Sequence, residues 1–302
     1  MTRLLSLLFA SALLVAGADA APNRTFVAST GNDINPCSLL QPCRGFQAAV
    51  AAVAPGGEVV ALDSAGYGPF TVDRPVTVAA DGVHASISVL ALNGVGITVG
   101  AGPTDVVTIR NITFLGPGGQ NAFGVQSFDG VGTLFVENCH FANFFAAVEC
   151  ESFGDAQLHV TNTIVESGTG PAIFAEAFDP GHVHMTVDNC TLSSSGSGVF
   201  AGTNAIAVAT GTVASGMTVD GAFVAGIGGG TLTLDRCVAS GSIAGITANE
   251  TGDVVRVADC VITNNTVGLQ VVSAGGSIVS MGGNRLIGND TDGTFTSTVP
   301  SQ

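Results

Sequence analysis

Val187-Asp188-Asn189-Cys190 is one copy of a short phrase that recurs along the chain and decides its fold. Strand-forming residues come first, then Asn or Asp in most copies, then often Cys. Other copies occupy residues 109–112, 136–139, 160–163, 234–237 and 257–260, and weaker ones occupy 208–211 and 279–282. The last residues of successive copies lie 21 to 27 residues apart. A period in the twenties is typical of a solenoid.

A second apolar run follows each copy, as in Ala147-Val148-Glu149-Cys150 and Ala172-Ile173-Phe174-Ala175. Two or three short strands per repeat make one turn of a parallel β-helix, with turns about 4.8 Å apart. We therefore predict an all-β, single-stranded, right-handed parallel β-helix of about ten coils. Residues 46–53 have helical apolar spacing and end before Pro55-Gly56-Gly57, which predicts a short capping helix over the N-terminal end of the stack.

The first twenty residues have the pattern of an export signal. Arg3 precedes an apolar run, and Ala18-Asp19-Ala20 fits a cleavage site. We predict a signal peptide at 1–20, a strand, disulfide loop and capping helix at 21–57, and the β-helix at 58–302. The later sequence contains no run of about 20 apolar residues, so no membrane span is expected and the protein is predicted to be secreted or periplasmic.

The net negative charge of the chain argues against several classes of binding partner. The net charge is −15 and every basic residue is Arg. Such a surface repels nucleic acid and anionic lipid, since both bind cationic faces. It also disfavours a polyanionic sugar polymer unless bound cations bridge the two. Arg110 is expected to pair with Glu137 on the adjacent coil.

Seven Cys in an exported chain fall into different classes. Cys37 and Cys43 flank a loop that contains Pro, and we predict a disulfide between them. The Cys that end the repeated phrase are interpreted as small inward residues rather than metal ligands, at a position that also accepts Ile112, Thr163 and Gly211. Cys237 and Cys260 would lie on adjacent coils, which leaves a disulfide between them open. The Asn before this position tolerates an unusual φ and can bond the backbone of its own turn. Its amide can also pair with the amide of the next coil, which is the ladder we predict as the second possibility.

The chain resembles the exported right-handed parallel β-helix proteins of bacteria, within the pectin-lyase-like superfamily. Residues 35–37, 41–43, 55–62, 66–68 and 275–289 carry the resemblance, together with the Asn-Cys phrases. The resemblance implies the fold but no single reaction, because the superfamily contains polysaccharide lyases, hydrolases, esterases and phage tailspikes. The Asp-Asp pair and Gly-His-Gly of polygalacturonases are absent. Arg74-Pro75 and Arg110 do not reproduce the Arg-x-Pro-x-x-Arg of pectate lyases.

Acidic residues form the first candidate site. Strand alternation directs Glu149, Glu151, Phe174 and Glu176 outward. Glu151 and Glu176 would stack on adjacent coils, and two carboxylates about 5 Å apart suit retaining glycoside hydrolysis. They are the predicted catalytic pair, with Glu149 and Phe174 contacting the ligand. The alternative is a pair of solvated side chains.

Histidines form the second candidate. His182, His184 and Asp188 alternate outward on one strand and are the predicted metal ligands. His159 would lie on the adjacent coil, and His159 and Asp188 are also candidate ligand-binding residues. The alternative is a solvated outer face. No cofactor is indicated apart from a divalent cation here.

Two functions follow from these patterns. The first is a non-enzymatic scaffold whose long side face binds a polysaccharide or a cell-surface protein, as rigid solenoids do. The alternative is a polysaccharide hydrolase or lyase that uses the outward acidic residues.

Overall fold

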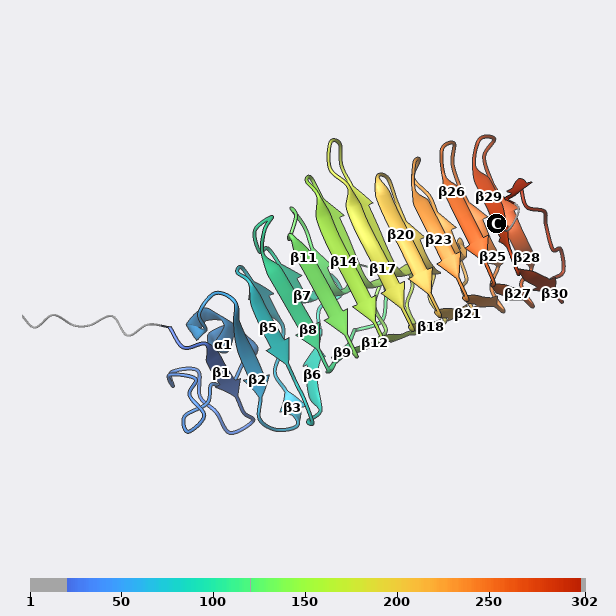
Figure 1. The fold of residues 1–302 in the computed structure, drawn as a ribbon. Coiled ribbons are helices and arrows are strands. Elements are labelled where there is room, and N and C mark those ends of the chain that lie inside the picture. Colours follow the sequence, from blue (N-terminus) through green and yellow to red (C-terminus); the bar gives the residue numbers. More distant parts are fainter. Residues whose placement is uncertain (1–20, 120, 300–302) are drawn as a thin grey trace, which may run out of the picture.

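Three parallel sheets run along the molecule and give it the form of an elongated solenoid (Figure 1). The structure is a computed structural model that describes residues 21–119 and 121–299, so the predicted signal at 1–20 lies outside the described residues. Sheet A contains β1 (Arg24–Val27), β2 (Gly57–Ala61), β5 (Val76–Ala79), β8 (Val106–Arg110), β11 (Thr133–Glu137), β14 (Ala156–Thr161), β17 (Val183–Asp188), β20 (Ala205–Thr210), β23 (Thr231–Asp235), β26 (Val254–Ala258), β29 (Ser277–Gly282) and β31 (Ser297–Thr298).

The other two sheets complete each turn. Sheet B contains β3 (Ala65–Gly66), β6 (Ala85–Ser88), β9 (Ile112–Leu115), β12 (His140–Ala142), β15 (Ile164–Glu166), β18 (Thr191–Ser193), β21 (Val213–Ser215), β24 (Val238–Ser240), β27 (Val261–Thr263) and β30 (Arg285–Ile287). Sheet C contains β4 (Phe70–Val72), β7 (Val95–Val99), β10 (Phe123–Ser127), β13 (Ala146–Ser152), β16 (Pro171–Ala177), β19 (Ser197–Ala201), β22 (Gly221–Ala225), β25 (Ala244–Ala248) and β28 (Val267–Val271).

Each complete turn takes one strand from each sheet in chain order, as in β8, β9 and β10. The predicted right-handed parallel β-helix is confirmed, and with it the resemblance at the level of the fold. Sheet C has nine strands, so the described chain makes nine complete turns where about ten were predicted. The predicted capping helix is α1 (Phe46–Ala52). The structure shows no helix, in the residues that it describes, that is both long and apolar enough to cross a membrane.

Identical register on successive coils builds the core. Leu134 in β11 lies opposite Leu158 in β14, which lies opposite Met185 in β17, and all three are fully buried. Inside sheet B, the rings of Phe114 and Phe141 stack with centroids 4.4 Å apart. These columns remove apolar surface from water continuously along the axis, which is the main stabilising term of a solenoid.

The repeated phrase makes the tight turn between sheets A and B. Its Asn residues have φ between 50° and 61°, as predicted, at positions 111, 138, 162 and 189. The predicted pairing of successive amides is wrong for the described residues: Asn111 donates to Asp81, and Asn189 donates to Asp188. Positive φ is therefore what the turn requires of Asn, which tolerates it better than most residues do.

The residue after this turn points inward, as predicted, but its role is more specific than size. The Cys139 thiol donates to the carbonyl two residues earlier, and the Thr163 hydroxyl does the same. The Thr163 oxygen also accepts from the Cys139 backbone N–H. Cys and Thr are thus suited to closing a turn whose backbone groups lack strand partners. Cys237 and Cys260 remain free thiols, with the Cys237 N–H 3.3 Å from the Cys260 sulfur.

In the two weaker copies of the phrase, residues 208–211 and 279–282, the inward position is not the one that the sequence pattern predicts. Thr210 pairs with Asp188, so Gly211 aligns with Asn189 and the inward position belongs to Thr212. At the last copy, Asn284 takes this position instead of Gly282, because its side-chain oxygen accepts from the Cys260 N–H. Gly211 has φ 58°, which explains why Gly replaces Asn there.

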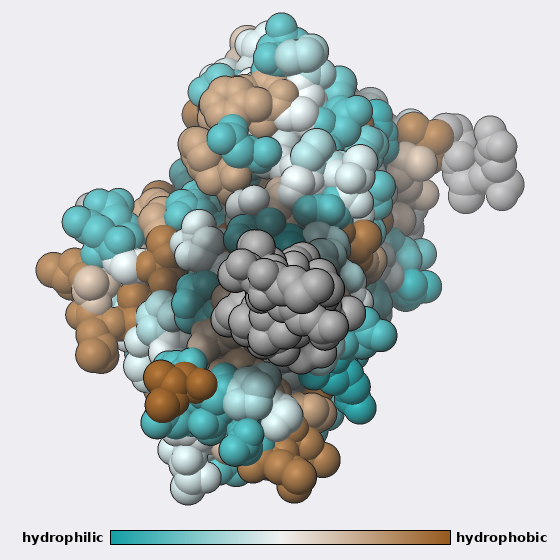
Figure 2. All heavy atoms as spheres, turned by 90° about the vertical axis from the view of Figure 1, so that its left-hand side faces the viewer, coloured by the Kyte–Doolittle hydropathy of each residue, from teal (hydrophilic) through white to brown (hydrophobic). Residues whose placement is uncertain are grey.

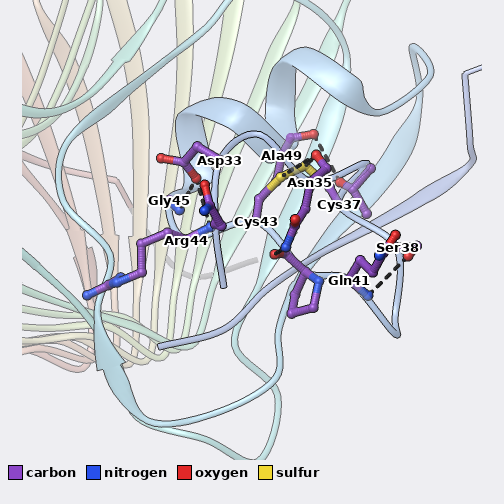
Figure 3. The surroundings of a disulfide bond; sticks show 12 residues. Asp33, Asn35, Cys37, Ser38, Gln41, Cys43, Arg44, Gly45 and Ala49 are labelled. Carbon is purple, nitrogen blue, oxygen red and sulfur yellow. Dashed lines mark hydrogen bonds between the residues drawn. A yellow bond between two sulfur atoms is a disulfide. The ribbon is translucent and has the colours of Figure 1, made fainter. Parts of the chain in front are cut away.

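The N-terminal end is covered by the helix and the disulfide loop. Phe46 of α1 packs against Tyr67 and Phe70 at ring distances of 5.0 and 5.2 Å. The predicted disulfide between Cys37 and Cys43 is present, and Asp33 beside it accepts from two backbone N–H groups (Figure 3). Apolar and polar residues are mixed over this end (Figure 2). The cap closes the open edge of the stack, which would otherwise be free to pair with another chain.

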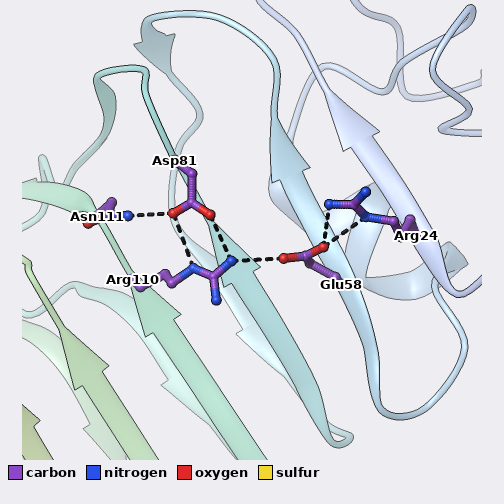
Figure 4. A network of polar contacts seen from close by, with 5 residues as sticks. All are labelled: Arg24, Glu58, Asp81, Arg110 and Asn111. Carbon is purple, nitrogen blue, oxygen red and sulfur yellow. Dashed lines mark hydrogen bonds and ion pairs between the residues drawn. The ribbon is translucent and has the colours of Figure 1, made fainter.

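A row of alternating charges crosses the outer face of sheet A near this end (Figure 4). Glu58 lies between Arg24 and Arg110, at 2.6 and 2.9 Å, and Arg110 also forms two hydrogen bonds with Asp81. The predicted Arg110–Glu137 ion pair is wrong, although the two residues are opposite in register. Arg110 extends toward the preceding coils because two carboxylates there outweigh the one on the other side.

Candidate functional site: a groove on the outer face of sheet C

Sheet C carries a column of outward side chains that includes a buried carboxyl group and two aromatic rings. Gln126 in β10 lies opposite Glu149 in β13, which lies opposite Phe174 in β16, which lies opposite Phe200 in β19. Their sequence neighbours, such as Val148 and Cys150, point into the core and are fully buried. Alternation along each strand and register between strands therefore place an amide, a carboxyl group and two rings in one line.

A groove of about 290 Å³ lies over this column. It spans several coils and is bounded by side chains from the strands and from the loops that flank them. Its lining residues are Phe145, Glu149, Glu151, Pro171, Phe174, Phe200, Asp220 and Ile227.

The floor of the groove is aromatic. Phe174 and Phe200 meet edge to face with centroids 5.6 Å apart, and with Val224 they form an apolar cluster separate from the core. Each ring is only 8% exposed although it points outward. The cluster therefore buries apolar area much as the core does, and the edges of the rings that stay exposed face the groove.

Glu149 is the most unusual carboxyl group in the groove. It is 6% exposed, and Gln126 Nε2 donates to its Oε2 at 2.6 Å. The pKa of Glu149 is raised to about 7, chiefly by burial. The hydrogen bond from Gln126 opposes the rise, and the charges of Glu151 and Glu176 add to it. A fraction of this group therefore carries a proton at neutral pH, so it can donate as well as accept.

Glu151 and Glu176 lie opposite each other on adjacent coils, as predicted. Burial raises the pKa of Glu151, and the charge of Glu176 adds to that effect. Glu151 lines the groove, whereas Glu176 stands beside it. The catalytic and ligand-binding roles predicted for these residues remain predictions, but the structure brings Glu149, Glu151 and Phe174 together in one groove.

Sequence reasoning missed part of the lining. Phe200 could have been found, because it follows Gly198-Val199 at the same repeat position as Phe174. Phe145, Asp220 and Ile227 come from turns whose shape no repeat pattern gives, and Pro171 is the first residue of β16. Asp220 is held by Ser197, whose hydroxyl donates to it at 3.0 Å.

The histidine candidates lie on a different face. His159 lies on the adjacent coil, as predicted, opposite Thr186, and Gln157 lies opposite His184. All of these residues belong to sheet A. Asp188 follows His184 by four residues on β17, about 13 Å along a strand, so the two do not converge on one point. Within residues 21–119 and 121–299, no group of three or more His, Cys, Asp or Glu side chains is arranged to hold a metal ion.

His159 has a structural environment. Its ring stacks on Phe135 with centroids 4.7 Å apart, and its Nδ1 lies 2.7 Å from the Thr186 hydroxyl. Burial lowers the pKa of His159, which favours the neutral ring. The ligand-binding residues predicted from sequence are therefore divided between two faces: Glu149 and Phe174 on sheet C, and His159 and Asp188 on sheet A.

Comparisons with known proteins find likeness in structure and not in sequence. No protein-family model matches the sequence, and no curated protein matches it. The crystal structure of the pectate lyase Pel9A is similar over 92% of this chain and 76% of its own, with a TM-score of 0.46 and 15% identity. The GH136 lacto-N-biosidase from Eubacterium ramulus is similar over 91% and 66%, with a TM-score of 0.38 and 10% identity. At these values the likeness is one of fold and extends to no residue or reaction.

Proposed function

We propose that this chain is an exported β-helix that binds a glycan along the outer face of sheet C. One observation carries the proposal: the groove combines an aromatic floor, Phe174 and Phe200, with the carboxyl groups of Glu149 and Glu151. Sugar rings have apolar faces that pack on aromatic side chains and hydroxyl groups that need acceptors. A mostly apolar pocket with a few convergent polar groups is the usual form of a ligand site.

The direction of the groove suits a chain molecule. Its lining residues come from β13, β16 and the neighbouring coils, so the groove runs across the strands and along the solenoid axis. Coils repeat about every 4.8 Å, so successive units of a polymer meet successive coils. The Cys37–Cys43 disulfide supports an oxidising compartment, in agreement with the predicted export signal.

Binding is tested with Phe174→Ala and Phe200→Ala on a panel of oligosaccharides, by calorimetry. We expect each variant to weaken binding at least tenfold, because each removes part of the floor. Phe135→Ala is the matched control: Phe135 is also an outward ring, on sheet A, and its loss leaves binding unchanged. The proposal is overturned if no oligosaccharide binds, or if Phe135→Ala weakens binding as much as Phe174→Ala does.

Glycoside hydrolysis is the second candidate, favoured by the state of Glu149. A carboxylic acid with a pKa of about 7 can protonate a leaving oxygen at neutral pH, while Glu151 on the same strand face acts as the second carboxylate. Glu149→Gln should abolish product formation, since Gln cannot donate the proton, while the aromatic floor of Phe174 and Phe200 remains in place. Release of reducing sugar that continues in Glu149→Gln would exclude this role for Glu149.

A further inference from the structure

The groove holds acidic groups without basic ones. The described residues that line it include Glu149, Glu151 and Asp220 but no Arg, Lys or His. Glu176 adds a fourth carboxyl group beside Glu151. A bound anion would meet repulsion from all of these, so the charge of the groove excludes a polyuronate as its ligand.

Within the part of the chain that the structure describes, one carboxyl oxygen of Glu149 accepts a hydrogen bond, and the other does not. Gln126 contacts only Oε2, and Oε1 has no hydrogen-bond partner among the described residues. A carboxyl group that is 94% removed from solvent and lines the groove with an unused acceptor is poised to meet a donor on the ligand. Burying a carboxyl group costs free energy, and a hydrogen bond from a ligand donor offsets that cost. A charged donor offsets it most strongly.

Aromatic rings beside carboxylates favour an organic cation. An ammonium group over the face of an aromatic ring is attracted by the ring's electron density, and the attraction grows as water is excluded. Charge-assisted hydrogen bonds to carboxylates are about twice as strong as neutral ones. Phe145, Phe174 and Phe200 supply rings, and Glu149 and Glu151 supply acceptors, in the same groove.

We infer that the groove selects a glycan that carries free primary amines, a polymer of 2-amino sugars, over its N-acetylated counterpart and over uronic acid polymers. This inference rests on the proposed glycan binding and specifies its substrate class. The sugar rings pack on Phe174 and Phe200, and the protonated amines meet Glu149, Glu151 and Asp220.

The test compares three oligosaccharides of equal length by calorimetry near neutral pH: one of glucosamine, one of N-acetylglucosamine and one of galacturonic acid. We expect the glucosamine oligomer to bind at least tenfold more tightly than the other two. Added salt should weaken its binding, because part of the affinity is electrostatic. An oligomer of lysine serves as a cationic probe without sugar rings.

Two variants test whether the charge of a groove carboxyl group, and not its shape, determines the affinity for the amine. Glu151→Gln should reduce affinity for the glucosamine oligomer about tenfold and affinity for the N-acetylated oligomer much less, because Gln keeps an acceptor oxygen but loses the charge. Glu137→Gln is the matched control, since Glu137 is an outward carboxyl group on sheet A, away from the groove.

Different failures have different meanings. If the N-acetylated oligomer binds as tightly as the amine, with dependence on Phe174, the amine inference is overturned while glycan binding stands. If the lysine oligomer binds more tightly than any sugar, the ligand is a cationic peptide and both proposals fall. If nothing binds, both fall as well.

Discussion

Two rows of carboxyl groups lie on the outer surface of the same solenoid and have opposite surroundings. On sheet A, Glu58 and Asp81 alternate with Arg24 and Arg110 (Figure 4). On sheet C, Glu149 has an amide for a partner, and no cation lines the groove among the described residues. Hydrogen bonding to Arg110 lowers the pKa of Asp81, whereas burial raises the pKa of Glu149 to about 7.

The contrast indicates which row serves the fold and which serves a ligand. Asp81 is half exposed, so water and Arg110 share the task of stabilising its charge. Glu149 has neither of these. A residue chosen for stability alone at its position would be apolar, as Val224 is three coils further along the same column. Carboxyl groups whose pKa is shifted by burial within a groove are concentrated at functional sites.

Replacing Glu149, the buried carboxyl group of sheet C, should have the largest effect on stability of the changes considered. The pKa of Glu149 rises from an ordinary 4.5 to about 7 on folding, so its contribution to stability is intact below pH 4.5 and is lost as the pH rises through 7. Glu149→Gln removes this dependence because Gln never ionises. We expect the variant to be more stable than the wild type by about 3 kcal/mol above pH 7 and similar near pH 4.

Chemical unfolding at the two pH values measures the difference. Glu137→Gln serves as the control and should show no comparable gain at high pH. A Glu149→Gln variant with the same pH dependence as the wild type would show that Glu149 is ionised without difficulty, and the contrast between the two rows would disappear.

Supplying the missing cation is the second test. Gln126→Arg places a guanidinium opposite Glu149 and so copies the arrangement of sheet A. We expect the pKa of Glu149 to fall well below 7, because a nearby positive charge favours the ionised form. Affinity for a glucosamine oligomer should fall at least tenfold, which is about 1.4 kcal/mol.

Carbon-detected NMR titration of labelled Glu follows the pKa, and calorimetry follows binding. Gln126→Met, which fills a similar volume without charge, is the control for shape. If Gln126→Arg lowers the pKa of Glu149 and amine binding is unchanged, the groove does not recognise the ligand through charge.

The sequence was sufficient for the architecture and for the register of the groove. Alternation and the repeat period placed Glu151 opposite Glu176, and Glu149 and Phe174 outward, as the structure has them. Periodicity succeeds here because each coil copies the one before it, so local pattern and tertiary position are the same information. The turn at Gly211 shows the limit: one residue of slip between strands moved the predicted inward position from Thr212 to its neighbour.

The degree of burial of each outward side chain and the ion-pair partner of each charged one could not be predicted from the sequence. Glu149 and Glu151 have the same place in the alternation, yet Glu149 is buried and Glu151 is half-buried. Alternation gives the face that a side chain points to and not how far its neighbours cover it. Arg110 is opposite Glu137 but bonds to Asp81. A long charged side chain can reach several oppositely charged groups. Which of them it pairs with depends on the electrostatic potential of all the charges around it and not on strand register.

Breaking the paired row should have a small effect. Arg110→Gln removes the bonds to Glu58 and Asp81. All three side chains are partly solvated, so stability should fall by about 1 kcal/mol at neutral pH. The pKa of Asp81 should return toward its ordinary value. Thermal unfolding and an NMR titration measure the two effects. A loss of several kcal/mol would mean that the charge row is a main support of the N-terminal coils.

The smallest effect expected is that of Glu151 on its neighbour. Burial is the leading cause of the raised pKa of Glu149, ahead of the charges of Glu151 and Glu176. Glu151→Gln should therefore lower the pKa of Glu149 only slightly, because the low-dielectric surroundings of the carboxyl group remain. NMR titration of Glu149 in this variant measures the change. A return of Glu149 to the ordinary carboxyl range would mean that mutual repulsion within the row, and not burial, sets the groove apart from sheet A.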